Sequence, residues 1–473
     1  MRERKLILVG LCMLAMEFLG RAQESVEGQP EPDELSYEEG AINEALSDDA
    51  LSDDALSDDP LSDETDLEAP PNVRDPRLGN PMLPQESTQE LPNMDGGNGY
   101  LRGQPLDGVA PDSRLQGGPE RRLWRINPQP FARLTYDDNI FISNTNRIAD
   151  LIWTAGLTVS FELGDFHDLK DNYLIAEWSG AGLLYTDNPS QNAFNQSANL
   201  VGSYHWQRLT AEIESRYQYL TGPDRQIGNV ASRQLIVNAL HLKYDLSGKI
   251  RLTADARQSA QLYQIYLDQY EYQVKAGLDY QIFPKLGLGV EGVAGVLRVQ
   301  ESPDQTYQQL RIRGGYSLTG KIDIKFSGGL EFREVDDGQP LKTYPAFSLS
   351  LNYRPFDGTL ISVEGYRTVF GSSSAIGQNF IATGFEVSIR QRIFQRITVT
   401  TAFGYENDDY FGTSQASQTK RVDNYFFIRP AISYALTRHA AFGIFYEFRR
   451  NESNQLVNTF FNNRAGLEFS MQL

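Results

Sequence analysis

The chain has 473 residues, of which 22% are charged and 11% are aromatic, and it contains 40 glycines. This composition is typical of an aromatic-rich β protein and unlike that of a chain that is disordered throughout. Residues 1–122 carry 10 Lys and Arg against 27 Asp and Glu, a net charge of −17, whereas residues 123–473 carry 33 against 35, a net charge of −2. Because neither part is basic, we expect no nucleic-acid partner.

The first 22 residues resemble a secretory signal peptide. Three basic residues precede the apolar run 6–20, and the small residues Gly20 and Ala22 occupy cleavage positions. Cys12 is the only cysteine of the chain, so cleavage after Ala22 would leave an exported protein without disulfides. We therefore predict export, and we expect stability to come from a source other than disulfides.

Residues 23–122 are predicted to form a disordered periplasmic extension. The segment 24–70 contains 18 acidic residues and no Lys or Arg, and it repeats ALSDD three times before PLSDE. Pro, Gly and Asn dominate the rest, so too little apolar surface is available to offset the entropy lost on ordering. The alternative is a tail that binds Ca²⁺ or a protein partner, such as envelope polysaccharide machinery. The repeat lacks the glycine-containing spacing of a calcium-binding loop.

From Trp124 onward, apolar and polar residues alternate along unusually long runs. In the run 248–263, Ile250 and Leu252 alternate with Arg251 and Thr253, which indicates a β-strand with one apolar and one polar face. We count 18 such runs, at residues 130–137, 149–164, 171–187, 194–206, 208–220, 233–246, 248–263, 269–282, 285–300, 306–318, 321–335, 342–354, 359–370, 378–391, 396–408, 423–436, 440–450 and 458–473.

The connections between the runs alternate in length. Short ones such as 247–249 and 355–358 alternate with longer polar ones such as 139–150 and 221–232. Short turns at one end and longer loops at the other are typical of outer-membrane barrels, in which every backbone polar group must pair within the protein. We therefore predict an all-β fold at residues 125–473. It is a transmembrane antiparallel up-and-down β-barrel of about 18 strands, in contact with outer-membrane lipid and with both chain ends in the periplasm.

The last run ends in a pattern of alternating apolar residues. Gly466, Phe469, Met471 and Leu473 resemble the C-terminal signal that the bacterial barrel-assembly machinery reads, although the terminal residue is Leu rather than the commoner Phe. Any final lipid-facing strand would share part of this pattern, so both interpretations stay open. The resemblance implies the assembly machinery as a partner.

The first run ends in TYDDNIF (135–141). The residues Tyr136, Asp137, Asp138 and Asn139 resemble the first hairpin of the putative β-barrel porin 2 family. This resemblance implies an outer-membrane barrel, often associated with exopolysaccharide loci, and it brings no established functional residues. The two aspartates and the asparagine can either cap a turn or bind a cation at the barrel rim, and we favour the turn.

Ionisable residues recur on the polar faces of the runs. The lumen-lining candidates are Arg251, Asp255, Arg257, Arg311, Arg313, Lys321, Asp323, Lys325, Arg333, Glu364 and Arg429. Water or dense pairing must compensate these charges, and barrels of 16–18 strands are wide enough for an aqueous channel. Arg311 and Arg313 facing Lys325 and Arg333 would form either a positive ladder for acidic sugars and anions or a salt-bridged wall, and we favour the wall.

These features predict a porin-like channel for diffusion of small hydrophilic solutes or for export of polysaccharide. The alternative is a non-conducting structural or assembly barrel that anchors an envelope complex through its acidic tail. We expect no enzyme, because none of the four histidines has a plausible Ser and Asp beside it. No cysteine-based zinc site, phosphate loop or dinucleotide-binding motif is present either, so no cofactor or metal is expected.

Overall fold

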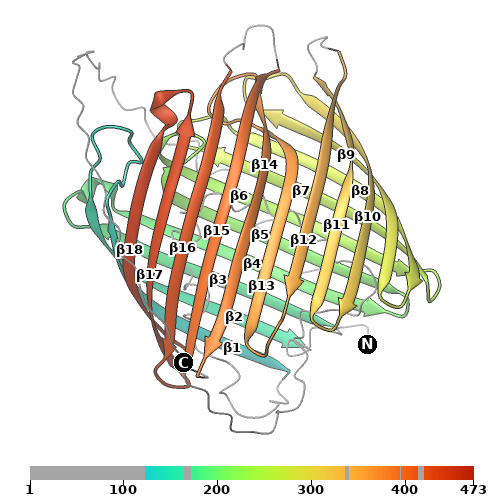
Figure 1. Ribbon diagram of the computed structural model, residues 1–473, viewed down its shortest axis with the longest axis horizontal. Coiled ribbons are helices and arrows are strands. Elements are labelled where there is room, and N and C mark those ends of the chain that lie inside the picture. Colours follow the sequence, from blue (N-terminus) through green and yellow to red (C-terminus); the bar gives the residue numbers. More distant parts are fainter. Residues whose placement is uncertain (1–122, 165–171, 336–339, 395, 414–419) are drawn as a thin grey trace, which may run out of the picture. The chain divides into compact units, whose positions relative to one another are not determined.

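The computed structural model describes residues 123–164, 172–335, 340–394, 396–413 and 420–473, which form 18 strands and two short 3-10 helices (Figure 1). The strands are β1 (Trp124–Asp137), β2 (Asp150–Gly164), β3 (Tyr173–Tyr185), β4 (Ala193–Trp206), β5 (Leu209–Asp224), β6 (Asn229–Asp245), β7 (Ile250–Tyr263), β8 (Gln269–Phe283), β9 (Leu286–Val299), β10 (Gln305–Thr319), β11 (Ile322–Val335), β12 (Lys342–Tyr353), β13 (Thr359–Gly371), β14 (Gln378–Ile393), β15 (Ile397–Gly412), β16 (Val422–Ala435), β17 (Ala440–Ser453) and β18 (Phe460–Met471). The helices are η2 (Pro189–Gln191) and η3 (Leu456–Asn458). The predicted signal peptide and acidic extension lie outside the described residues. Among the residues that the structure describes, no helix is long and apolar enough to span a membrane.

The strands form one closed sheet. Each pairs antiparallel with its neighbours along the chain, and β1 pairs with β18 to complete the ring. Closure gives every strand a partner on both sides, so that backbone polar groups pair within the protein as a membrane-spanning sheet requires. The predicted antiparallel up-and-down barrel of about 18 strands is therefore confirmed.

The two ends of the barrel differ in their connections. At the end where β1 begins and β18 ends, strands are joined by short connections such as 207–208, 284–285 and 320–321. We call this the short-turn end. At the opposite end, the loop end, connections include 138–149 and 372–377.

The first strand is longer than the sequence indicated. It begins at Trp124 and pairs with β2 along its whole length, but it pairs with β18 only from Phe131 onward. Pro128 and Pro130 lie in the half that has a single partner strand. Proline has no N–H to donate and is therefore tolerated where one side of a strand is unpaired.

Side chains alternate between the two faces of the barrel wall. On β10, Leu310 and Ile312 are 66% and 60% exposed on the outer face, whereas Arg311 and Arg313 point inward and are buried. The outer face is rich in large apolar and aromatic side chains, including Trp153, Phe347 and Tyr446. This face matches the apolar band of a transmembrane barrel, and the inner face forms a polar lumen.

Candidate functional site: the barrel lumen

The strand register places ten of the eleven predicted lumen-lining residues on the inner face. They are Arg251, Asp255 and Arg257 on β7, Arg311 and Arg313 on β10, Asp323, Lys325 and Arg333 on β11, Glu364 on β13, and Arg429 on β16. Lys321 lies instead in the β10–β11 turn, where its Nζ donates to the carbonyl oxygen of Pro355 (2.9 Å). A register shift between Ser317 and Thr319 moves this turn, and β11 starts only at Ile322.

The arginines of β10 and β11 are paired with carboxylates. Arg313 donates to Asp279 on β8 (2.9 Å) and to Glu291 on β9 (2.7 Å). Arg333 forms an ion pair with Glu331 on its own strand (2.7 Å). These pairs favour a salt-bridged wall over a positive ladder that would grip anions.

A second ion-pair network joins β1, β17 and β18. Arg464 forms ion pairs with Asp137 (2.6 Å) and Glu447 (3.7 Å). Arg133 is paired with Glu468 on the neighbouring strand (2.7 Å). All five side chains are at most 3% exposed, so their charges are compensated by each other and not by bulk water.

The predicted rim motif forms the first turn at the loop end. The backbone N–H of Asn139 donates to one Asp137 carboxylate oxygen (2.9 Å), and the Arg464 guanidinium donates to the other (2.6 Å). Asp138 accepts a hydrogen bond from the backbone of Asn463 on β18 (2.7 Å), whereas Tyr136 points outward. These contacts favour turn capping over a cation site. In the described part of the chain, no group of three or more His, Cys, Asp and Glu side chains is arranged to hold a metal ion.

Residues 140–142 of the β1–β2 connection fold into the lumen. Ile140 packs with Ile152 of β2 and Leu183 of β3, and Ile142 packs with Tyr425 of β16 and Phe460 of β18. Ile142 has a φ of 49°, a left-handed conformation that a β-branched residue adopts only under strain. Burial of its side chain therefore holds the loop in a conformation that its backbone disfavours.

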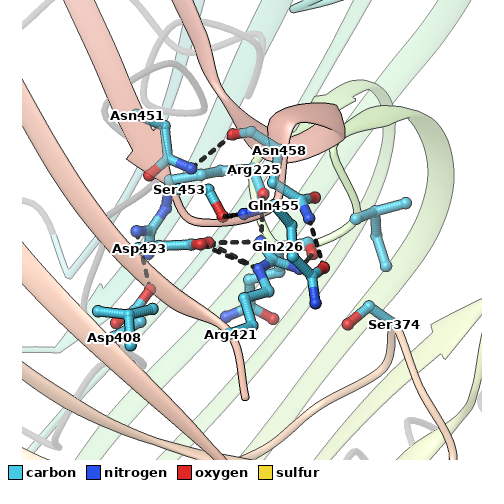
Figure 2. A network of polar contacts seen from close by, with 12 residues as sticks. Arg225, Gln226, Ser374, Asp408, Arg421, Asp423, Asn451, Ser453, Gln455 and Asn458 are labelled. Atoms are coloured by element: carbon cyan, nitrogen blue, oxygen red, sulfur yellow. Dashed lines mark hydrogen bonds and ion pairs between the residues drawn. The ribbon is translucent and has the colours of Figure 1, made fainter. Parts of the chain in front are cut away.

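The β5–β6 turn, residues 225–228, also lies inside the barrel. Arg225 contacts Glu406 and Asp408 of β15 (2.9 Å to Asp408), and its guanidinium group lies 4.6 Å from the ring centre of Tyr425. Figure 2 shows Arg225 and Gln226 beside Asp423 and Arg421. The Arg421 guanidinium donates to the Gln226 carbonyl oxygen (2.9 Å) and to Asp423.

Sequence reasoning missed this cluster because residues 221–232 were interpreted as an extended polar loop. The structure continues β5 to Asp224 and starts β6 at Asn229, which leaves a turn of four residues. Asp224 and Gly228, two turn-forming residues four positions apart, are the sequence signal that could have indicated a tight turn.

Ionisable residues nearer the short-turn end are more accessible. Lys243 and Glu212 form an ion pair (2.9 Å) in which both side chains are 20% exposed. Arg354 and Asp323 are similarly accessible and lie 3.6 Å apart. Glu364 is an exposed residue on the inner face of β13. Water therefore reaches this half of the lumen.

The remaining predicted residues lie as follows. Phe469 and Met471 point outward from β18, and Leu473 follows the strand. Gly466 points inward, where an added Cβ would lie 2.5 Å from the ring of Phe445, so no larger residue fits. Recognition of this segment by the assembly machinery stays a prediction. His241 contacts Asp255 of β7.

The sequence matches the family described as Putative beta-barrel porin 2 over residues 124–473. The chain belongs to this family. The porin-like barrel is thus an outer-membrane β-barrel protein, and the resemblance inferred from its first hairpin is confirmed.

Several solved structures are similar to the chain at low identity. OccAB3 of Acinetobacter baumannii has a TM-score of 0.39 and 10% identity, covering 74% of this chain and 99% of that one. OpdK of Pseudomonas aeruginosa has a TM-score of 0.37 and 13% identity, covering 74% and 98%. OccK3 (OpdO) of the same organism has a TM-score of 0.35 and 11% identity, covering 74% and 95%. None of the curated proteins compared with the chain matches it.

Proposed function

We propose that the porin-like barrel is an outer-membrane channel for small hydrophilic solutes. The observation that carries this proposal is the charged inner face near the short-turn end, where the side chains of Lys243, Glu212 and Glu364 are accessible to solvent. A barrel of 18 strands is wide enough to hold an aqueous path. Because acidic and basic side chains alternate along this face, we expect weak rather than strong ion selectivity.

We further propose that the short-turn end faces the periplasm. Both ends of the barrel segment lie there, and the Leu473 amide N–H donates to the Pro128 carbonyl oxygen (3.1 Å). Short turns on the periplasmic side and longer loops outside are the usual arrangement of bacterial barrels. Residues 1–122, with their net charge of −17, would then precede the barrel on the periplasmic side.

Reconstitution of the purified protein in planar lipid bilayers tests the channel. We expect discrete conductance steps in KCl, and swelling of proteoliposomes in small sugars. Protein that is folded in vesicles but conducts neither ions nor sugars would refute the channel function.

A second function, a non-conducting scaffold, is supported by the dense packing at the loop end. There the turn 225–228 and the loop residues Ile140 and Ile142 are packed inside the barrel. Deletion of residues 24–120 discriminates between the two functions. Unchanged conductance argues for the channel, whereas absent conductance in both proteins together with loss of co-purifying envelope proteins on deletion argues for the scaffold.

A further inference from the structure

The β5–β6 turn touches a wall of the barrel to which it is not adjacent. Eight strands separate β6 from β15 on one side of the ring, and six separate β5 from β16 on the other. The contacts of Arg225 with Glu406 and Asp408 therefore cross the lumen instead of following the wall. The turn therefore stands in the path of solutes that would enter at the loop end.

The opposite wall offers Arg225 a site suited to a guanidinium group. Two carboxylates, Glu406 and Asp408, contact it from β15, and the Tyr425 ring on β16 lies under its plane. Carboxylates and aromatic faces are the two preferred partners of a planar guanidinium cation. Tyr366 also donates a hydrogen bond to Glu406, which fixes the orientation of that carboxylate.

The turn itself is ordered by its own hairpin and by β7. The Asp224 carboxylate accepts hydrogen bonds from the backbone N–H of Gln226 (2.9 Å) and from the Tyr263 hydroxyl (3.0 Å). It also forms an ion pair with Arg233 (2.7 Å). Gly228 supplies the left-handed φ of 79° that closes the turn. Loss of the contacts to β15 and β16 would therefore release a turn that keeps its shape.

The energetic balance of the contact suits an element that opens and closes. Five charged side chains are buried together, three carboxylates (Glu406, Asp408, Asp423) and two guanidinium groups (Arg225, Arg421). The attraction within a buried ion pair is largely offset by the desolvation of its members, so the net free energy of closure is small. An equilibrium of this kind is shifted by modest changes at one residue.

We propose that the β5–β6 turn is a gate at the loop end of the lumen, and that Arg225 holds it shut by occupying a guanidinium-binding site on β15 and β16. The inference rests on the proposed channel function. Opening requires that Arg225 leave Glu406 and Asp408, that Arg421 release the backbone carbonyl oxygens of Gln226 and Arg225, and that Gly228 move away from Asn458. The barrel strands keep their pairing.

Single-channel recording of Arg225→Ala tests the gate. Arg133→Ala is the matched control, because Arg133 is equally buried and paired with Glu468, but between neighbouring strands β1 and β18. We expect Arg225→Ala to raise the fraction of time spent open at least about tenfold, which corresponds to about 1.4 kcal/mol, and the control to leave it unchanged. Both variants are first checked for folding by their heat-dependent mobility in detergent gels.

Chemical rescue sharpens the test. Ethylguanidinium added to Arg225→Ala should fill the vacated site and change the conductance in a saturable way, whereas ethylammonium should act more weakly. The double variant Glu406→Gln, Asp408→Asn keeps Arg225 but removes its partners, so it should open like Arg225→Ala and not respond to ethylguanidinium. If Arg225→Ala does not fold, this double variant carries the conductance test.

The outcomes separate the gate from the channel. Equal, non-zero conductance of folded wild type, Arg225→Ala and the double variant would overturn the gate and leave the channel function standing. An increase in the Arg133→Ala control that matches Arg225→Ala would also overturn it. Absence of conductance in all folded variants would overturn both proposals.

Discussion

The two halves of the lumen are built from the same residue types and yet differ in their access to water. At the loop end, the paired Arg464 and Asp137 side chains are 3% and 0% exposed. Toward the short-turn end, the paired Lys243 and Glu212 side chains are each 20% exposed. Strand alternation gives both pairs their inward direction, so alternation does not explain the difference.

The difference comes from what lies over the wall. At the loop end, the turn 225–228 and residues 138–142 fold inward and cover the charged side chains. The short connections at the other end, such as 207–208 and 284–285, are too short to reach across the lumen. Two charges toward the short-turn end are exceptions. Asp279 lies beside Arg251 in the register but is buried because Arg313 binds it from two strands away, and Glu468, near the end of β18, is buried in its ion pair with Arg133. The turn 225–228 has only four residues, so the inward folding of a connection, and not its length alone, sets the hydration of a charge whose direction the strand has fixed.

The largest loss of stability is expected where a buried charged side chain at the loop end loses its partner. Arg464→Ala removes the cation that Asp137 and Glu447 share, and leaves two buried carboxylates without it. Breaking a buried ion pair by removal of one partner costs about 3–5 kcal/mol, so we expect that loss in the free energy of unfolding. Urea unfolding in lipid vesicles, followed by the fluorescence of the four tryptophans, measures it.

Lys243→Ala, which changes an accessible ion pair nearer the short-turn end, is the control. Exposed ion pairs contribute roughly 0–1 kcal/mol, and we expect no more than that here. Equal losses for the two variants would show that the loop end is as hydrated as the short-turn end, which would contradict the comparison.

A smaller loss of stability is expected for the apolar side chains of residues 138–142, which cover the inner wall at the loop end. Ile142→Ala removes a buried side chain from its cluster with Tyr425 and Phe460, and we expect a loss of about 2–4 kcal/mol. Release of backbone strain at the φ of 49° offsets little of this, because alanine also disfavours that region. Faster proteolysis within residues 138–149 should accompany the loss.

Ile148→Ala in the same connection is the matched control, because Ile148 is 41% exposed. We expect an effect within about 0.5 kcal/mol for this variant. If Ile148→Ala destabilised the protein as much as Ile142→Ala, burial inside the lumen would not be what holds the loop.

The strands and their faces could be predicted from the sequence because both depend on local alternation. The strand containing Ile250, Leu252 and Arg251 shows the pattern within a few residues. Eighteen such segments are enough to predict a closed antiparallel barrel. Errors arose where local signals are weak. A register shift near Ser317 placed Lys321 in a turn, and Pro128 made the first half of β1 hard to recognise as strand.

The inward folding of the turn 225–228 and of residues 138–142 could not be predicted, because the contacts of these segments join residues far apart in the chain. Arg225 and Glu406 are 181 positions apart, and Asp137 and Arg464 are 327 apart. Alternation says that Glu406 points inward, but it carries no information on which cation crosses the lumen to reach it. The turn residues Asp137 and Asn139 were recognised by their chemistry, whereas the arginine that binds Asp137 was not assigned to it.

The smallest effect in stability, and the most direct one for conduction, is expected at Lys243 and Glu212. Lys243→Ala leaves the Glu212 carboxylate facing the wet lumen, so the channel should become more cation-selective, while Glu212→Gln should shift it toward anions. Reversal potentials under a tenfold KCl gradient measure both shifts. They should shrink as the salt rises toward 1 M, because the Debye length falls from about 10 Å at 0.1 M to about 3 Å. Shifts of the same sign in the two variants, or no shift in either at low salt, would mean that ions do not pass this face, and the accessible half of the lumen would then not be part of a conduction path.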